Sequence, residues 1–188
     1  MQNDSNRRNF LKGSTAAAAG AALTSTIART AHAAGSDEIK FVLIGCGGPE
    51  SGPFEGNRLP AISVTDIDGQ VLTPDSHRGK PVVMVFWASW CGPCRAEAPE
   101  IARMAEQYGS SIQLLSINAG ETPTAARSAA KTMGVAGTIV LDQDASLQTA
   151  FRVDAIPLLV IADSDGVVRY RGNRLPSDVY RILDGLIG

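Results

Sequence analysis

The segment 80–108 constrains the fold most, because a strand pattern passes directly into a helix pattern. It reads KPVVMVFWASWCGPCRAEAPEIARMAEQY. Residues 82–86 form a continuous apolar run with β-branched side chains, which is typical of a buried central strand. From Pro93 onward, apolar residues recur at spacings of three and four, which indicates an amphipathic helix. Cys91 and Cys94 therefore fall where the strand passes into the helix. The apolar positions of the helix are Ala98, Ile101, Met104, Ala105 and Tyr108.

The position of Cys91 at a helix N-terminus predicts a reactive thiol. The first N–H groups of a helix have no helical partner and carry partial positive charge, so they should lower the pKa of Cys91. Pro93 suits the first turn, since it lacks an N–H that would have no partner there. Cys94 lies one turn further on the same side and can close a disulfide with Cys91. Trp87 and Trp90 can wall the site, leaving Cys91 as the exposed sulfur.

The C-x-x-C spacing also occurs in haem and zinc sites. Residue 95 is Arg, which excludes the C-x-x-C-H haem attachment motif. Zinc needs four ligands, and behind an N-terminal signal only Cys46, His77, Cys91 and Cys94 offer a thiol or imidazole. We therefore expect no metal and no cofactor. Two alternative interpretations of the pair are not excluded. One is a purely structural disulfide. The other is a copper or haem-maturation binding module, which would use both thiols and need a further Met or His nearby.

Residues 1–33 have the order of an export signal. Two adjacent arginines lie in SNRRNFLK (5–12), an alanine-rich stretch follows, and Ala31-His32-Ala33 fits an A-x-A cleavage site. These features resemble the twin-arginine export signal, while the apolar stretch is too short and weak for a membrane span. The alternative is a basic, alanine-rich tail. Export would place the protein in the periplasm or another extracytoplasmic compartment, where disulfides persist. The formal net charge of −2 argues against a nucleic-acid partner.

Residues 34–57 are interpreted as a linker. Within them, IKFVLIGCGGPESG resembles a dinucleotide-binding turn, but Glu50 stands where the third glycine is needed and prolines break any following helix. The stretch 43–46 matches a lipobox in letters, yet charged residues separate it from the apolar part of the signal. A lipid anchor at Cys46 is therefore the less favoured alternative. Residues 5–48 also resemble the exported branch of the glucose–fructose oxidoreductase/inositol dehydrogenase family, whose signal runs into a first Rossmann strand.

The motif FWASWCGPCRAEAP carries a second resemblance, which covers residues 58–188. This part of the chain resembles the TlpA-like (ResA-like) branch of the thioredoxin superfamily. The resemblance implies an α/β thioredoxin fold, with a central mixed sheet flanked by helices and an added N-terminal β-hairpin. The resulting domains are the signal 1–33, the linker 34–57 and a thioredoxin-like domain 58–188.

Patterns elsewhere in the chain agree with this fold. Alternating or continuous apolar runs predict strands, and spacings of three and four predict helices. Helix 122–134 has Thr122 as its N-cap and Gly134 as its stop. The predicted strands are 111–119 and 138–142, with a helical turn at 145–153. The predicted hairpins are 62–73, turning at Asp68-Gly69, and 157–172, turning at 164–166; a last helix covers 176–187, with Leu175, Val179, Ile182, Leu183 and Leu186 facing inward.

The resemblance also implies how clients are bound. The proline that matches Pro157 is cis in the family and packs against the C-x-x-C pair, and the residue before it pairs with an extended stretch of substrate. Ile156 would be that docking residue here. Trp90, Gly92 and Pro93 complete the candidate substrate-binding surface. The alternative is an ordinary trans proline at the start of a strand.

Three positions depart from thioredoxin or bear on proton transfer. Val85 stands where thioredoxins carry a buried carboxylate, so that proton acceptor is absent. Glu97 matches a carboxylate that some TlpA-like and cytochrome-maturation reductases use, and it could take the proton from Cys94. The alternative for Glu97 is an exposed glutamate of the first turn, favoured by the helix dipole. Leu158 replaces the threonine common after the cis-proline.

These observations predict an exported thiol–disulfide oxidoreductase in which Cys91 attacks and Cys94 resolves. Gly-Pro between the cysteines implies, by resemblance, a reductase of protein disulfides. The implied partners are disulfide-bearing clients, with apocytochromes as one class, and a DsbD/CcdA-like membrane thiol reductant. A redoxin-type peroxidase is an alternative enzyme, but its P-x-x-x-T/S-x-x-C pattern is not met by Met84 and Ala88.

Overall fold

The computed structural model describes residues 54–73 and 78–188. A five-stranded sheet with the order β5-β4-β3-β6-β7 forms the centre. β4 is parallel to β3 and β5, whereas β6 is antiparallel to β3 and β7. The sheet is therefore mixed, as predicted. Its strands are β3 (Val82–Trp87), β4 (Gln113–Ala119), β5 (Thr138–Asp142), β6 (Leu158–Ala162) and β7 (Val168–Gly172).

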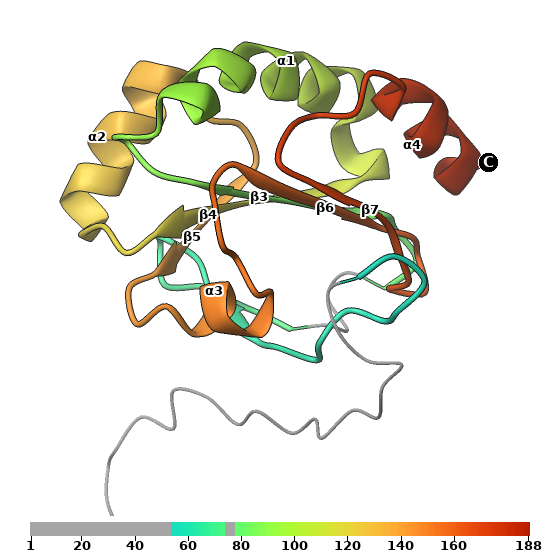
Figure 1. Ribbon diagram of the computed structural model, residues 1–188, viewed down its shortest axis with the longest axis horizontal. Helices are drawn as coiled ribbons and strands as arrows, with labels where there is room; N and C mark the ends of the chain where they lie inside the picture. The colour runs from blue at the N-terminus through green and yellow to red at the C-terminus, as the bar shows by residue number, and fades with distance from the viewer. Residues whose placement is uncertain (1–53, 74–77) are drawn as a thin grey trace, which may run out of the picture. The chain divides into compact units, whose positions relative to one another are not determined.

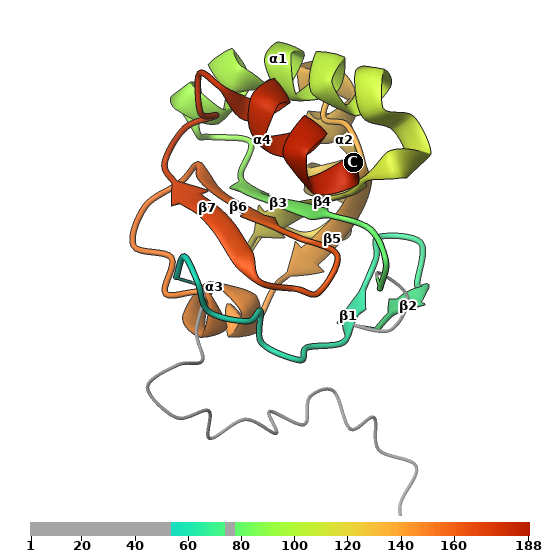
Figure 2. The same cartoon turned by 90° about the vertical axis from the view of Figure 1, so that its right-hand side faces the viewer.

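Helices cover both faces of this sheet (Figures 1 and 2). α1, α2 and α4 lie over one face, and α3 lies on the other together with the N-terminal hairpin. The helices are α1 (Gly92–Tyr108), α2 (Pro123–Met133), α3 (Ser146–Ala150) and α4 (Val179–Ile187), with a short 3-10 turn, η2 (Gly109–Ser111), after α1. Every predicted helix of the thioredoxin-like domain is present, and no helix end differs from its predicted limit by more than three residues.

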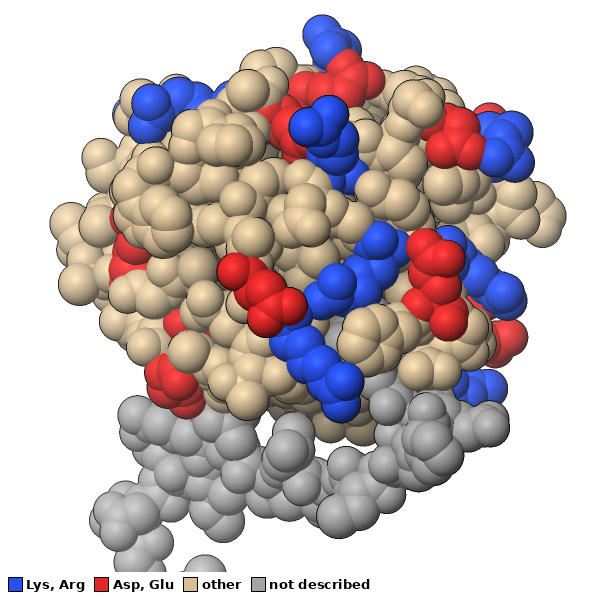
Figure 3. All heavy atoms as spheres, in the orientation of Figure 1, with Lys and Arg blue, Asp and Glu red and all other residues tan. Residues whose placement is uncertain are grey.

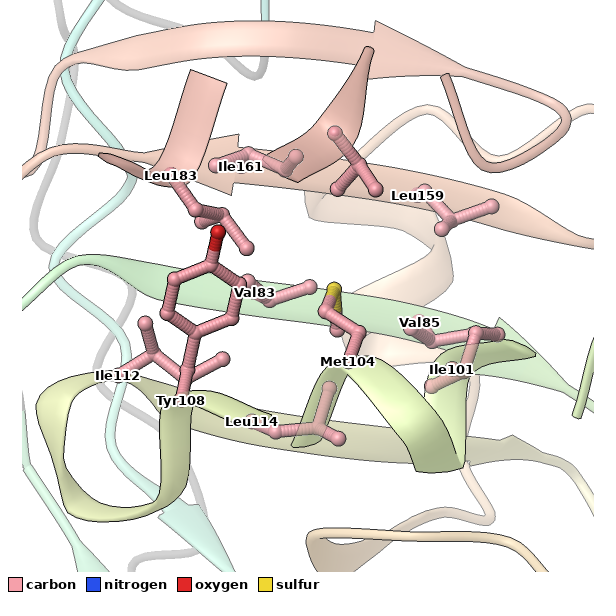
Figure 4. Close-up of a cluster of buried hydrophobic side chains, with 11 residues drawn as sticks. Val83, Val85, Ile101, Met104, Tyr108, Ile112, Leu114, Leu159, Ile161 and Leu183 are labelled. Atoms are coloured by element: carbon pink, nitrogen blue, oxygen red, sulfur yellow. The ribbon is translucent and has the colours of Figure 1, made fainter. Parts of the chain in front are cut away.

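The two apolar faces of β3 follow from the alternation of side chains along a strand. Val83 and Val85 face α1 and α4 in one core cluster, whereas Val82 and Phe86 face α3 in the other. Figure 4 shows the first cluster, in which Met104 lies between strand and helix side chains. Because both faces of β3 are covered, apolar residues are favoured at every position of this central strand.

The ends of α2 confirm the predicted capping residues. The hydroxyl of Thr122 accepts a hydrogen bond from the N–H of Ala125 at 3.4 Å. Gly134 ends the helix in the left-handed conformation, with φ of 67°. At the far end of α1, the hydroxyl of Tyr108 donates to the carbonyl of Tyr180 and to a carboxylate oxygen of Asp184, which joins α1 to α4.

The added N-terminal hairpin is present but short. β1 (Val64–Thr65) pairs with β2 (Val71–Leu72), and Gly69 occupies the turn with φ of 86°. The N–H of Ile67 donates to the carbonyl of Ile139 in β5, which attaches the hairpin to the edge of the main sheet.

Residues 54–57 pack on the domain as well. The N–H of Gly56 donates to the carbonyl of Val168, and the N–H of Val168 donates to the carbonyl of Asn57. The folded part of the chain therefore includes four residues of the predicted linker.

Candidate functional site: the cysteine pair at the start of α1

The two cysteines lie at the junction that the sequence predicts. β3 ends at Trp87, three residues follow, and Cys91 is the N-cap of α1. A disulfide joins Cys91 to Cys94, so the structure represents the oxidised state. The Sγ atom of Cys91 accepts a hydrogen bond from the N–H of Cys94 at 3.1 Å. A thiolate at Cys91 would therefore meet a helical N–H directly, which stabilises negative charge.

Burial differs from the sequence prediction. Cys91 is only 3% exposed and Cys94 only 4%, so the expectation that Cys91 is the exposed sulfur is wrong for the disulfide-bonded protein. The reason is the apolar cluster around the pair, in which Trp87 is also buried and Ile156 packs from the opposite loop. Trp90 is instead 71% exposed and marks the site on the surface. The two sulfurs are distinguished by their place in the helix, because only Cys91 is the N-cap.

A small cavity lies behind Cys94. Its volume is about 20 Å³, and Val85, Ser116 and Pro157 are among the residues that line it. Val85 thus occupies the place next to the inner sulfur that the resemblance assigns to a carboxylate. The hydroxyl of Ser116 donates to the carbonyl of Ala136 at 2.6 Å. None of the residues lining this cavity is a carboxylate.

The Ile156–Pro157 peptide bond is cis, as predicted. Pro157 lines the same small cavity as Cys94. Ile156 packs against the cluster that contains both cysteines. Leu158, which follows, is the first residue of β6 and is 1% exposed. The chain thus brings the C-x-x-C motif and the cis-proline loop together, although they are far apart in sequence. Gly92 and Pro93, which lie between the two cysteines in the sequence, are exposed at the start of α1.

Glu97 is half-buried rather than an exposed residue of the first turn. One carboxylate oxygen accepts a hydrogen bond from the N–H of Leu175 at 3.2 Å, while the other is buried without a partner among the described residues. Burial raises the pKa of Glu97, and the Leu175 N–H and the charge of Arg174 offset this only in part. A carboxylate with a raised pKa, one turn after Cys94, suits proton transfer.

Sequence reasoning missed Glu121, which holds the loop before Cys91. Its carboxylate accepts hydrogen bonds from the N–H and the hydroxyl of Ser89, and from the side-chain amide of Asn118. Arg95 donates to the carbonyl of Ser89 at 2.8 Å, so each polar group of Ser89 has a partner. Glu121 follows β4, and the carboxyl ends of the parallel strands β3 and β4 meet at one edge. That adjacency is the signal that could have indicated it.

Burial would raise the pKa of Glu121, but the hydrogen bonds from Ser89 and Asn118 outweigh it and lower the pKa below the ordinary value. Glu121 is therefore held as a carboxylate. It fixes the backbone two residues before Cys91 through charge-assisted hydrogen bonds, which are about twice as strong as neutral ones.

No group of three or more His, Cys, Asp or Glu side chains among residues 54–73 and 78–188 is arranged to hold a metal ion. Within the same ranges, no helix has the length and apolar character needed to cross a bilayer. Charges of both signs lie side by side on the face shown in Figure 3. A short stripe of basic side chains on that face has acidic side chains on either side of it.

Comparison with known proteins identifies the family. The model of the Redoxin family matches residues 54–179. The chain belongs to the redoxin family. A second model, the TAT (twin-arginine translocation) pathway signal sequence, matches residues 4–24. This redoxin therefore carries the predicted signal for export to the periplasm or extracytoplasmic space.

Relatives of this redoxin are thiol–disulfide enzymes. It is 28% identical over 134 residues to the thiol-disulfide oxidoreductase ResA of Geobacillus kaustophilus, covering 70% of this chain and 77% of the relative. The ResA of Bacillus subtilis is 30% identical over 115 residues, covering 61% of this chain and 64% of the relative. With the Cys91–Cys94 pair in place, the redoxin is a thiol–disulfide oxidoreductase.

Solved structures confirm the thioredoxin-like fold. The structure of MTB dsbF has a TM-score of 0.61 at 26% identity, covering 67% of this chain and 95% of that one. A thioredoxin-like protein from Aeropyrum pernix has a TM-score of 0.59 at 25% identity, covering 66% and 88%. The comparisons give no support to the resemblance of residues 5–48 to the glucose–fructose oxidoreductase family. That stretch, the predicted linker up to residue 53 and Cys46 lie outside the described residues.

Proposed function

We propose that this redoxin reduces disulfides in exported client proteins. The observation that carries the proposal is the placement of Cys91 as the N-cap of α1, with its sulfur accepting a helical N–H and Cys94 one turn behind. An N-cap thiolate is stabilised by the helix, and a second thiol within bonding distance can release the mixed disulfide.

The reaction begins with the reduced protein. The Cys91 thiolate attacks one sulfur of the client disulfide, and the other client sulfur leaves as a thiolate. Cys94 then loses its proton to Glu97 and attacks the Cys91 sulfur. The second client thiolate leaves, and the Cys91–Cys94 disulfide forms. The client gains two electrons and the protein loses two, which gives the oxidised state that the structure contains.

The client is held beside Cys91 by an exposed surface. Trp90, 71% exposed, offers an apolar contact, and Gly92 and Pro93 leave the approach to the disulfide free of bulky side chains. Ile156, before the cis-proline, pairs through its backbone with an extended stretch of the client, as strands pair at a sheet edge. Apocytochromes, whose haem-binding cysteines must be reduced, are one client class that fits this reaction.

The oxidised protein needs a supply of electrons. A DsbD/CcdA-like membrane thiol reductant would attack the Cys91–Cys94 disulfide and return two electrons, so that the client and the reductant use the same surface in turn. The signal at residues 4–24 supports this arrangement, because the protein works outside the cytoplasm and away from its soluble reductants.

Trapping tests the roles of the two cysteines. In a Cys94→Ala variant, mixed disulfides with client proteins should accumulate through Cys91, and they should disappear in a Cys91→Ala variant. Both variants carry Cys46→Ala, so that the third thiol forms no adducts. Trapping through Cys94 instead of Cys91 would reverse the assignment.

The reduction potential tests the direction of electron flow. A reductant should have a value near that of thioredoxin, about −270 mV, whereas a value near that of DsbA, about −120 mV, would indicate an oxidase. Equilibration of the Cys91–Cys94 pair with defined ratios of reduced and oxidised dithiothreitol measures it. A peroxidase would instead consume hydrogen peroxide stoichiometrically with oxidation of the pair, and we expect no such consumption.

A further inference from the structure

Side chains of β7 and of the residue directly after it hold the loop that carries Ile156 and Pro157. The side-chain amide of Asn173, the residue after β7, donates to the carbonyl of Ala155 at 3.1 Å and to the carbonyl of Pro157 at 3.0 Å. Both hydrogens of the amide are thereby used. The chain entering β6 and the chain leaving β7 lie close together in Figure 1.

Arg171, within β7, holds the other end of the same loop. Arg171 lies two positions before Asn173, and its guanidinium donates to the carbonyls of Phe151 and Arg152 at 3.0 and 2.8 Å. Side chains two apart leave a strand on the same side. Arg171 and Asn173 therefore hold the two ends of the 151–157 loop by hydrogen bonds to its carbonyls. Asn173 bonds the end that carries the cis-proline.

The exit of β7 is built to place Asn173. The hydroxyl of Tyr170 donates to the carbonyl of Arg174 at 2.6 Å, across the position of Gly172. A Cβ atom at Gly172 would lie 2.2 Å from that hydroxyl, so a larger residue there would displace the Tyr170 ring from this position. The turn that carries Asn173 is thus fixed on both sides of the residue.

These hydrogen bonds leave the peptide groups of Ile156 open. The carbonyls of its two neighbours, Ala155 and Pro157, are bound to Asn173. No hydrogen bond among the described residues uses the N–H or carbonyl of Ile156.

We propose that Asn173 is a positioning residue for client binding, because its two hydrogen bonds hold the Ile156 peptide groups ready to pair with an extended client strand. The inference rests on the proposed function, in which Ile156 is the docking residue. Asn173 touches neither sulfur, so it acts on client affinity and leaves the chemistry of the cysteines unchanged.

The test compares two substrates with the same leaving group in single-turnover reactions of the reduced full-length protein. One is dithiobis(nitrobenzoate), a small disulfide without peptide groups. The other is an extended peptide whose cysteine carries nitrothiobenzoate. In Asn173→Ala, the half-saturating concentration of the peptide should rise about fivefold, the loss expected from two weak neutral hydrogen bonds. Its maximal rate, the rate with the small disulfide and the reduction potential should stay unchanged.

Two further variants control the test. Asn173→Asp keeps the shape of the side chain but has no donor at neutral pH, so it should weaken peptide binding at least as much. Asn57→Ala removes the same side chain near the opposite end of β7 and should change nothing, because the N–H of Val168 donates to the backbone carbonyl of Asn57, which the substitution keeps. Asn173 is exposed, so its replacement should leave the protein folded.

The outcomes separate the two proposals. Peptide binding that is unchanged in Asn173→Ala, or rates that fall equally for both substrates, would overturn the positioning role. Failure of both Asn173 variants to fold would overturn it too, since the residue would then be needed for structure. A wild-type protein that reduces neither substrate would instead overturn the proposed function.

Discussion

Replacing Glu97 with glutamine should raise the free energy of unfolding and, in the same variant, slow the release of the client from the mixed disulfide. The carboxylate has one buried oxygen with no partner among the described residues, and burial is the largest influence on its raised pKa. A buried polar group without a partner costs about 1–3 kcal/mol, and more when it is charged, so the ionised carboxylate costs more than a neutral amide in the same place. Because Glu97 is only half-buried, solvent screening places the cost near the lower end, about 1 kcal/mol. Glutamine keeps one oxygen for the Leu175 N–H and removes the charge.

The pH dependence follows from the direction of the shift. The pKa of Glu97 is higher in the folded protein than the ordinary value of 4.5, so the folded state binds this proton more tightly than the unfolded state. The free energy of unfolding of the wild type therefore falls as the pH rises from about 4.5 through the folded pKa. Glutamine does not titrate. The advantage of Glu97→Gln should be absent below about pH 4.5 and complete above the folded pKa, reaching about 1 kcal/mol.

Urea unfolding of the disulfide-bonded protein between about pH 4 and pH 8 measures this difference. Glu106, exposed on the same helix, provides the matched control, and Glu106→Gln should change stability by less than about 0.5 kcal/mol at every pH. In the same Glu97→Gln variant, release of the client from the mixed disulfide should slow about 100-fold, the usual contribution of a general base. A difference in stability that is constant with pH, or a variant that is less stable at neutral pH, would refute this account of Glu97.

Three other substitutions test the packing around the site. Glu121 has a lowered pKa, so its stabilising contribution is present above about pH 4.5 and lost as the pH falls through the folded pKa; Glu121→Gln should remove that acid sensitivity in urea unfolding. Tyr108→Phe leaves Asp184 without its phenolic donor and should cost about 1–2 kcal/mol by the same assay. Met104→Ala empties a fully buried position and should cost about 2–5 kcal/mol.

The elements of the fold could be predicted because their signals are local. The apolar run of β3 and the spacing of α1 each lie within one segment of chain, and Thr122 and Gly134 mark the ends of α2 by their own conformational preferences. The cis-proline, by contrast, was predicted only through the family resemblance. Nothing in the letters around residue 157 distinguishes it from a trans proline at the start of a strand.

The contacts that complete the site are not local. Glu121 meets Ser89 across 32 positions of sequence, and only the pairing of β3 with β4 brings them together. Asn173 meets Ala155 across 18 positions because β7 returns beside the loop before β6. The burial of Cys91 also depends on packing, since Ile156 reaches it from the far loop. The residue pattern along one strand or helix does not predict contacts between distant segments unless the order of the strands in the sheet is already known.

Glu97 and Glu121 show how burial and hydrogen bonds can shift the pKa values of two carboxylates in opposite directions. Hydrogen bonds from Ser89 and Asn118 outweigh burial at Glu121 and lower its pKa, whereas burial outweighs the single N–H at Glu97 and raises its pKa. Environments that separate the pKa values of neighbouring acids assign one to proton transfer and the other to permanent charge. In the proposed mechanism Glu97 is therefore the carboxylate that takes and returns the Cys94 proton, while Glu121 stays charged and holds the loop that leads into Cys91.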